Sequence, residues 1–156
     1  MALGGTVLEY VDTPIADTST RMAPLTTRLL QKHGAKWTHA LAINDLYFDF
    51  MGPALAAAGI PGGGSPKAGS AGDGSEAAFQ RIRGGQYQTI TVADPLNLQG
   101  WQLVDELNRA IQGAPCSGYI TAPALVTQEG LAKMGDSNAF DPDSPYREVY
   151  AGSWGK

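Results

Sequence analysis

Cysteine is almost missing from this sequence, because Cys116 is the only one among 156 residues. A single thiol excludes an internal disulfide and any zinc cluster built from several cysteines. Long apolar runs are missing too, and none approaches the roughly 20 residues that a membrane-spanning helix needs. The sequence therefore predicts neither a disulfide scaffold nor insertion into a membrane.

Charge is also scarce: 17% of the residues are charged, and the net charge is −4 without any cluster of lysine and arginine. Nucleic acid and anionic membranes are therefore poor candidates for partners. The motifs of serine hydrolases, zinc peptidases, Walker-type nucleotide sites and dinucleotide sites are absent, so no metal or cofactor is implied. Residues 1–6 lack the basic start and apolar core of a signal peptide, which predicts a cytoplasmic location for this form.

What the sequence does contain is typical of one globular domain. Hydrophobic residues make up 43%, enough for a substantial core in a chain of this length. Glycine (20) and proline (10) are abundant, and they mark a loop at residues 60–69 and a partly irregular tail at residues 130–156. We therefore expect one domain over residues 1–129, followed by this tail.

The most informative local pattern is a strand followed by a helix. Residues 38–43 form a mostly apolar run, typical of a strand buried on both faces of a parallel sheet. Asn44 and Asp45 follow as candidate N-caps, and apolar residues then recur at helical spacing until Gly59 ends the pattern. Both polar residues therefore belong at the junction where the strand ends and the helix begins.

Similar patterns recur along the chain, and the alternation of strands and helices predicts the fold. Strands are expected at residues 6–11, 38–43, 68–71, 87–92 and 118–126, and helices near residues 17–32, 46–57, 78–84, 98–112 and 146–150. This order favours a three-layer α/β sandwich with a flavodoxin-like, mostly parallel sheet of about five strands.

Three polar residues mark the expected strand-to-helix junctions: Asn44, Asp73 and Asp94. In an open α/β sheet these junctions converge on one edge, where ligands bind. Amide and carboxylate groups suit the hydroxyls of a sugar, since an amide both donates and accepts and a carboxylate accepts strongly. Each residue also has a purely structural explanation as a helix cap or turn residue.

Three longer phrases together resemble a known family. They are W-T-H-A-L-A-I-N-D-L-Y-F-D-F-M (37–51), A-G-D-G-S-E-A-A-F-Q-R-I-R (71–83) and T-V-A-D-P-L-N-L-Q-G-W-Q-L-V-D-E-L-N-R-A-I-Q-G (91–113). The chain, from about Thr6 onward, resembles the C-terminal half of a periplasmic sugar-binding protein. Such proteins are the solute-binding components of ABC sugar importers, here of the ribose-binding-like class I.

The resemblance implies a function and a site. Two α/β lobes of such a receptor close on a sugar, and the matching positions here, Asn44, Asp73 and Asp94, would hold its hydroxyls. The implied ligand is a sugar or polyol, the implied partner is an ABC permease, and the family location is the periplasm. The aromatic stacking wall of the family belongs to the other lobe.

The chain also differs from the family pattern. A receptor of this family has two lobes, whereas this chain has the residues of about one and resembles a truncated receptor. In the family, the helix that contains Trp101 crosses the hinge and packs on the other lobe. We therefore expect this helix to fold back on its own sheet or onto a second copy. A homodimer, including a domain-swapped one, is the expected assembly.

Two other functions compete with non-catalytic carbohydrate binding. A hydrolase could use Asp73 and Asp94 as a carboxylate pair, or Cys116 with His39 or His33. Against it, His39 is expected in the core, His33 at a helix C-terminus and Cys116 buried before the last strand. The third function is structural: an inactive half-lobe that self-associates.

Overall fold

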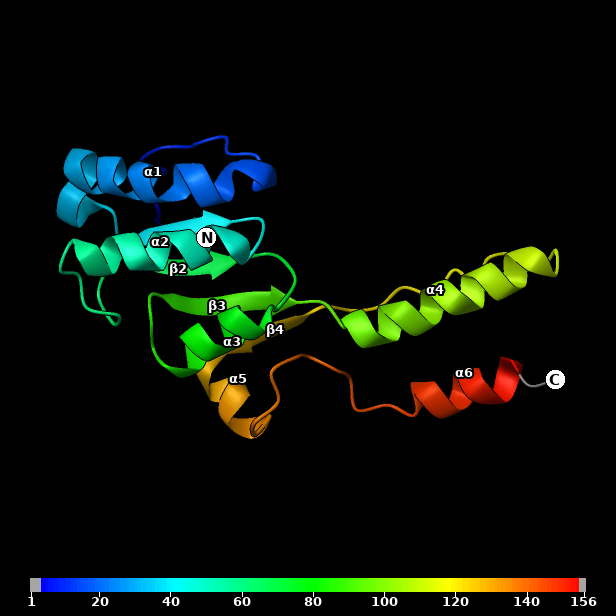
Figure 1. Ribbon diagram of the computed structural model, residues 1–156. Helices are drawn as coiled ribbons and strands as arrows, with labels where there is room; N and C mark the ends of the chain where they lie inside the picture. Colours follow the sequence, from blue (N-terminus) through cyan, green and yellow to red (C-terminus); the bar gives the residue numbers. More distant parts are fainter. Residues whose placement is uncertain (1–3, 155–156) are drawn as a thin grey trace.

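The computed structural model describes residues 4–154. Residues 1–3 of the expected domain and residues 155–156 of the expected tail lie outside the described residues. It consists of an α/β body and a long projecting arm (Figure 1). The body carries one four-stranded sheet, in the order β1-β2-β3-β4. None of the described helices is long and apolar enough to cross a membrane.

The sheet is mostly parallel, as the sequence predicts. β1 (His39–Ala42), β2 (Lys67–Ser70) and β3 (Gln88–Ala93) run parallel, whereas β4 (Ala124–Thr127) is antiparallel to β3. The expected strands at 38–43, 68–71 and 87–92 are therefore present within one or two residues. The last strand is shorter than the expected 118–126 and runs in the opposite direction to its neighbour.

Two helices cover one face of this sheet. α2 (Leu46–Ala57) packs on β1 and β2, and α3 (Glu76–Arg83) packs on β3 and β4. Paired residues of neighbouring strands point to the same face, and the row Ala42, Ser70, Thr91 and Val126 joins the two helix-packed regions. The body core therefore lies between this row and the α2–α3 layer.

The remaining body helices flank this layer. α1 (Thr18–His33) follows a short 3-10 turn, η1 (Ile15–Asp17), and packs against α2. A second turn, η2 (Gly34–Lys36), leads from α1 into β1, and α5 (Gln128–Lys133) packs beside α3. Pro53 lies inside α2 without ending it, so the helix keeps the full length that the apolar spacing predicts.

The opposite face of the sheet is apolar and uncovered. Leu41 of β1 is 86% exposed and Leu125 of β4 is 64% exposed. Ile90 lies over Gly69, where a Cβ would be 2.8 Å from the isoleucine Cγ1. The expectation that residues 38–43 form a strand buried on both faces is therefore wrong, because no helix of the described chain covers Leu41.

The prediction of a strand at residues 6–11 is also wrong, since residues 4–14 form no helix or strand. Glu9 instead attaches this segment to the last turns of α1. Its carboxylate accepts hydrogen bonds from Arg28, Lys32 and His33 at 2.6, 2.8 and 3.0 Å, respectively. β1 pairs with β2, and its outer edge stays unpaired among the described residues. The contacts of Glu9 with α1 therefore hold this segment away from that edge.

The arm consists of α4 (Leu96–Ile111), a return segment over residues 112–123, and α6 (Tyr146–Trp154). The return segment runs back along α4, because Ser117 contacts Glu106 and Gln99 donates to Thr121. The chain thus leaves and re-enters the sheet at the same edge. This explains why β4 runs antiparallel to β3.

Aromatic stacking holds α6 against α4. The ring of Trp101 stacks on that of Trp154 with centroids 5.2 Å apart and also contacts Tyr146 and Tyr150. The Trp154 indole donates to Asp105 at 2.9 Å. Hydrogen bonds from Arg109, and secondly from Trp154, lower the pKa of Asp105 below its ordinary value. The helix of Trp101 thus packs on the C-terminal tail and not on its own sheet.

Candidate functional site

The candidate site lies at the edge where the three parallel strands end. Asn44 follows β1, Asp73 follows β2 and Asp94 follows β3. The strands are parallel and adjacent, so their C-terminal ends meet at one edge, as the sequence predicts. Asp73 is exposed, whereas Asn44 and Asp94 are half-buried.

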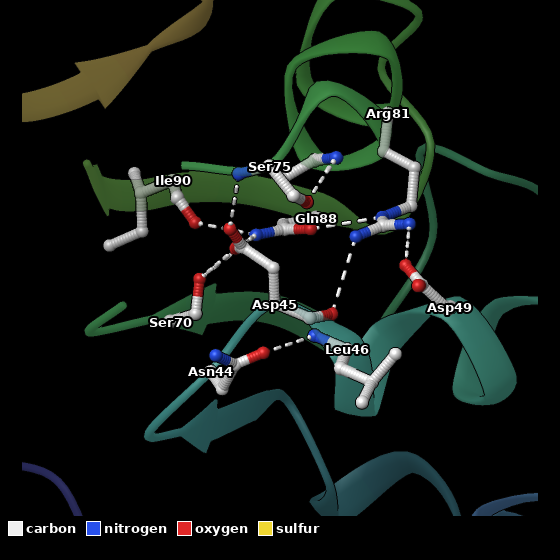
Figure 2. Close-up of polar contacts among 10 residues, drawn as sticks. Asn44, Asp45, Leu46, Asp49, Ser70, Ser75, Arg81, Gln88 and Ile90 are labelled. Carbon is white, nitrogen blue, oxygen red and sulfur yellow. Dashed lines mark hydrogen bonds and ion pairs between the residues drawn. The ribbon is translucent and has the colours of Figure 1, made fainter. Parts of the chain in front are cut away.

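Asn44 and Asp73 are in direct contact. The Asn44 side-chain NH2 donates to Asp73 Oδ2 at 2.5 Å. The amide oxygen of Asn44 accepts from the backbone N–H of Leu46 at 2.8 Å, in the first turn of α2 (Figure 2). Asn44 is therefore both a helix cap and a neighbour of the exposed carboxylate, so the structural and functional explanations apply to one side chain.

The turn that carries Asp73 lies against the ends of both neighbouring strands. A Cβ on Gly72 would be 2.6 Å from the Ile43 carbonyl oxygen, and one on Gly74 would be 2.3 Å from the Ala93 Cβ. Gly74 also has a φ of +67°, which favours glycine. These two glycines allow Asp73 to lie between the ends of β1 and β3, next to the residue that precedes Asp94.

Asp94 is less closely integrated than the other two residues. Its backbone carbonyl accepts from Leu96 at the start of α4. No hydrogen bond links its side chain to Asn44 or Asp73 among the described residues. The structure thus joins two of the three predicted residues directly and places the third at the end of the neighbouring strand.

The neighbouring Asp45 has a different position and a different role. It is only 1% exposed, and its carboxylate accepts three hydrogen bonds. Ser70 Oγ and Gln88 Nε2 donate to Oδ1, the latter at 2.6 Å, and the Ser75 backbone N–H donates to Oδ2 at 2.9 Å (Figure 2). Because these groups come from β2, β3 and the start of α3, Asp45 holds the strand ends in place beneath the exposed edge.

Arg81 of α3 fixes the orientation of the Gln88 amide. Its Nε–H donates to Gln88 Oε1 at 2.9 Å, which turns the NH2 of Gln88 toward Asp45. The same guanidinium pairs with Asp49 and donates to the Asp45 carbonyl at 3.3 Å. The buried carboxylate is therefore held by a second row of polar contacts, visible in Figure 2.

Sequence reasoning missed this buried network. The sequence places Asp45 beside Asn44 as a second candidate cap, yet its side chain makes no capping hydrogen bond to α2. If side chains alternated strictly between the two faces along β3, Gln88 would lie with Ile90 on the uncovered face of the sheet. A register shift between Ala68 and Gly69 instead turns Gln88 to the covered face. Polar Gln88 and Thr91 within a β-branched strand were the only local signal.

The cysteine that a thiol hydrolase would use lies in the arm, and the two histidines that could serve as its base lie in the body. Cys116 is exposed in the return segment of the arm, whereas His33 ends α1 and His39 begins β1 in the body. His39 is exposed and contacts Thr38, and His33 contacts Glu9. The predictions of a core His39 and a buried Cys116 are wrong, because neither the start of β1 nor the return segment is covered at these positions.

The side chains that commonly bind metals do not gather at this edge. No group of three or more histidine, cysteine, aspartate or glutamate side chains in residues 4–154 is placed to hold a metal ion. The contact that Asn44 and Asp73 make at this edge is a hydrogen bond between an amide and a carboxylate. Asp73 Oδ1 has no hydrogen-bond partner among these residues, which leaves it able to accept from a ligand hydroxyl.

The fold is shared with part of a solved sugar-binding protein, which confirms the predicted α/β fold with a mostly parallel sheet and agrees with the predicted resemblance at the level of the fold. The chain is similar to the crystal structure of a galactofuranose-binding protein, with a TM-score of 0.61 at 17% sequence identity. The match covers 74% of this chain but only 39% of that one. Comparisons with protein-family models and with curated proteins find no match.

Proposed function

We propose that this protein binds a sugar or polyol without catalysis, at the edge formed by Asn44, Asp73 and Asp94. The observation that carries the proposal is the Asn44–Asp73 contact at the C-terminal ends of adjacent parallel strands. It places an amide and a carboxylate with a free oxygen side by side on rigid elements, a donor and acceptor set that suits paired hydroxyls. The fold shared with a galactofuranose-binding protein supports the same ligand class.

The wider role follows from the family resemblance. As a sugar-binding lobe, the protein would act as the solute-binding part of an ABC importer and would present its ligand to a permease. We expect weak binding by a single copy, because one lobe encloses a sugar from one side only. This part of the proposal rests on the resemblance and on the fold, and not on any contact in the structure.

The hydrolase alternative receives less support from the geometry. The side-chain contact of Asp73 among the described residues is with the amide of Asn44. A glycosidase needs two carboxyl groups that flank one bond, and a thiol enzyme needs a base beside the cysteine. The positions of Cys116, His33 and His39 do not provide that second arrangement.

A thermal-shift screen against pentoses, hexoses and sugar alcohols, with galactose among them, tests the proposal. A ligand at one hundred times its dissociation constant adds about 2.7 kcal/mol of stability and raises the Tm by several degrees. Asp73→Ala should abolish the shift, whereas Asp136→Ala, which removes an exposed carboxylate from the tail, should leave it unchanged. The absence of a shift with every sugar would contradict the proposal and favour the inactive, self-associating half-lobe.

A further inference from the structure

The arm carries an apolar stripe that nothing in the described chain covers. It consists of Leu103, Val104, Leu107 and Ile111, which recur at helical spacing along α4, and Ile111 is 77% exposed. The opposite side of α4 packs on α6 through Trp101 and Asp105. α4 is therefore apolar on two sides, and only one of them is used within the chain.

Every charged side chain of α4 already has a hydrogen-bond partner within the chain. Arg109 binds Asp105 at 2.7 Å, and Glu106 accepts a hydrogen bond from the Ser117 backbone N–H at 3.0 Å. Hydrogen bonds from Ser117 lower the pKa of Glu106 below its ordinary value, and the hydrogen-bonded Asp105 raises the pKa of Arg109. The charged side chains beside the arm stripe therefore make hydrogen bonds within the chain, and the stripe itself consists of apolar side chains only.

The uncovered sheet face in the body is a second surface of the same kind. Its apolar centre consists of Leu41, Ile43, Ile90, Val92 and Leu125, and His39 and Lys67 lie on the same face at the start of β1 and β2. A sheet face of this composition is stable when a helix packs on it, which is how α/β domains build their layers. The sheet face lacks a helix, and the arm stripe lacks a sheet.

The two surfaces do not meet within one chain. Figure 1 shows α4 extending away from the strands that precede and follow it, and α6 lies along it. The stacking of Trp101 on Trp154 holds α4 to α6 in this extended arrangement. Residues 4–154 thus leave both surfaces uncovered, and a second copy of the chain would carry the complement of each.

We propose that two copies of this protein exchange arms, so that the stripe of each α4 packs on the uncovered sheet face of the other copy. The contact is reciprocal, which closes the assembly as a two-fold dimer. The dimensions agree: the stripe from Leu103 to Ile111 spans about 12 Å of helix, and a four-residue strand such as β1 spans about 13 Å. Each copy would thereby gain a helical layer on its second face.

Mass measurement of single and mixed variants tests the exchange in the absence of sugar. The wild type should sediment at about twice its 16.4 kDa at about 100 μM, a concentration at which a dimer with a micromolar Kd is almost fully formed. Leu107→Glu in the stripe and Leu41→Lys on the sheet face should each weaken the dimer about tenfold or more, because each places a charge in an apolar contact. Both side chains are exposed, so far-UV circular dichroism should show an unchanged fold.

The mixture of these two variants distinguishes arm exchange from other dimers. An equimolar mixture should recover the dimer, since one of its two contacts is then wild type and the other places the new glutamate of one copy against the new lysine of its partner. Val149→Glu, an exposed position on α6 outside both surfaces, should keep the wild-type mass. Three outcomes would overturn the proposal. The wild type could be monomeric, the dimer could be lost with Leu107→Glu but kept with Leu41→Lys, or the mixture could stay monomeric.

Discussion

At the scale of single residues, the central feature is a buried carboxylate beneath an exposed one. Asp45 and Asp73 flank the same edge, but donors from three segments enclose Asp45, whereas Asp73 Oδ1 has no hydrogen-bond partner among residues 4–154. A buried charge costs folding free energy unless hydrogen bonds compensate it. The network around Asp45 therefore determines whether the ends of β1, β2 and β3 stay in register.

Gln88→Glu should destabilise the protein strongly. The change replaces the amide that donates to Asp45 at 2.6 Å with a second buried carboxylate, so the free energy of unfolding should fall by about 3 kcal/mol. Urea denaturation measures this difference. Gln80→Glu makes the same chemical change on the exposed side of α3 and should stay within about 0.5 kcal/mol of the wild type. Equal effects of the two variants would show that Asp45 does not depend on its partner.

At the scale of elements, one carboxylate ties the N-terminal segment to α1. Hydrogen bonds from Lys32, Arg28 and His33, in that order of effect, lower the pKa of Glu9 from its ordinary 4.5 to about 2. A carboxyl group with a lowered pKa in the folded state contributes stability above its unfolded pKa, and this contribution is lost as the pH falls. The tie should therefore be complete at neutral pH and should weaken between about pH 4.5 and pH 2.

Glu9→Gln should remove this pH dependence. The Tm of the variant should lie below that of the wild type at pH 7, and the difference should shrink as the pH falls through 4.5 toward 2. Limited proteolysis of residues 4–14 should be faster in the variant at pH 7. Glu129→Gln breaks an exposed pair with Lys133 and should alter the Tm little, because exposed pairs contribute little stability. A difference that persists unchanged at pH 2 would contradict the assigned role of Glu9.

At the scale of the whole molecule, the arm and the body are held by separate clusters of side chains. The body core gathers around Phe48, Met51 and Phe79, whereas the arm is held by Trp101 with Tyr146, Tyr150 and Trp154. The two parts should therefore respond independently to substitutions. The proposed exchange of arms requires this independence.

Trp101→Ala should release α6 while the sheet stays intact. The variant loses stacked and edge contacts with three aromatic rings, a loss on the order of 2 kcal/mol for the arm. Hydrogen exchange of residues 146–154 should accelerate, and that of residues 88–93 should not. Val149→Ala, which trims an exposed side chain of the same helix, is the control and should change neither. Equal acceleration in both regions would mean that arm and body unfold together.

The sequence by itself determined the three parallel strands, most of the helices and which polar residues stand at the strand ends. Residues 46–57 and 98–112 carry helical periodicity, and the structure places helices at Leu46–Ala57 and Leu96–Ile111. Asn44, Asp73 and Asp94 follow three parallel strands as predicted. These features depend on local patterns, which a short stretch of sequence already contains.

Only the tertiary structure decided which surfaces these elements cover. The composition of residues 6–11 suits a strand, yet Glu9 binds the end of α1 and the segment does not pair with β1. Burial of Leu41 required a helix on the second face, and the direction of β4 followed from the path of the arm. Gln88 faces Asp45 because the register shifts between β2 and β3. Pairing and burial depend on contacts between residues far apart in the chain, which local periodicity does not encode.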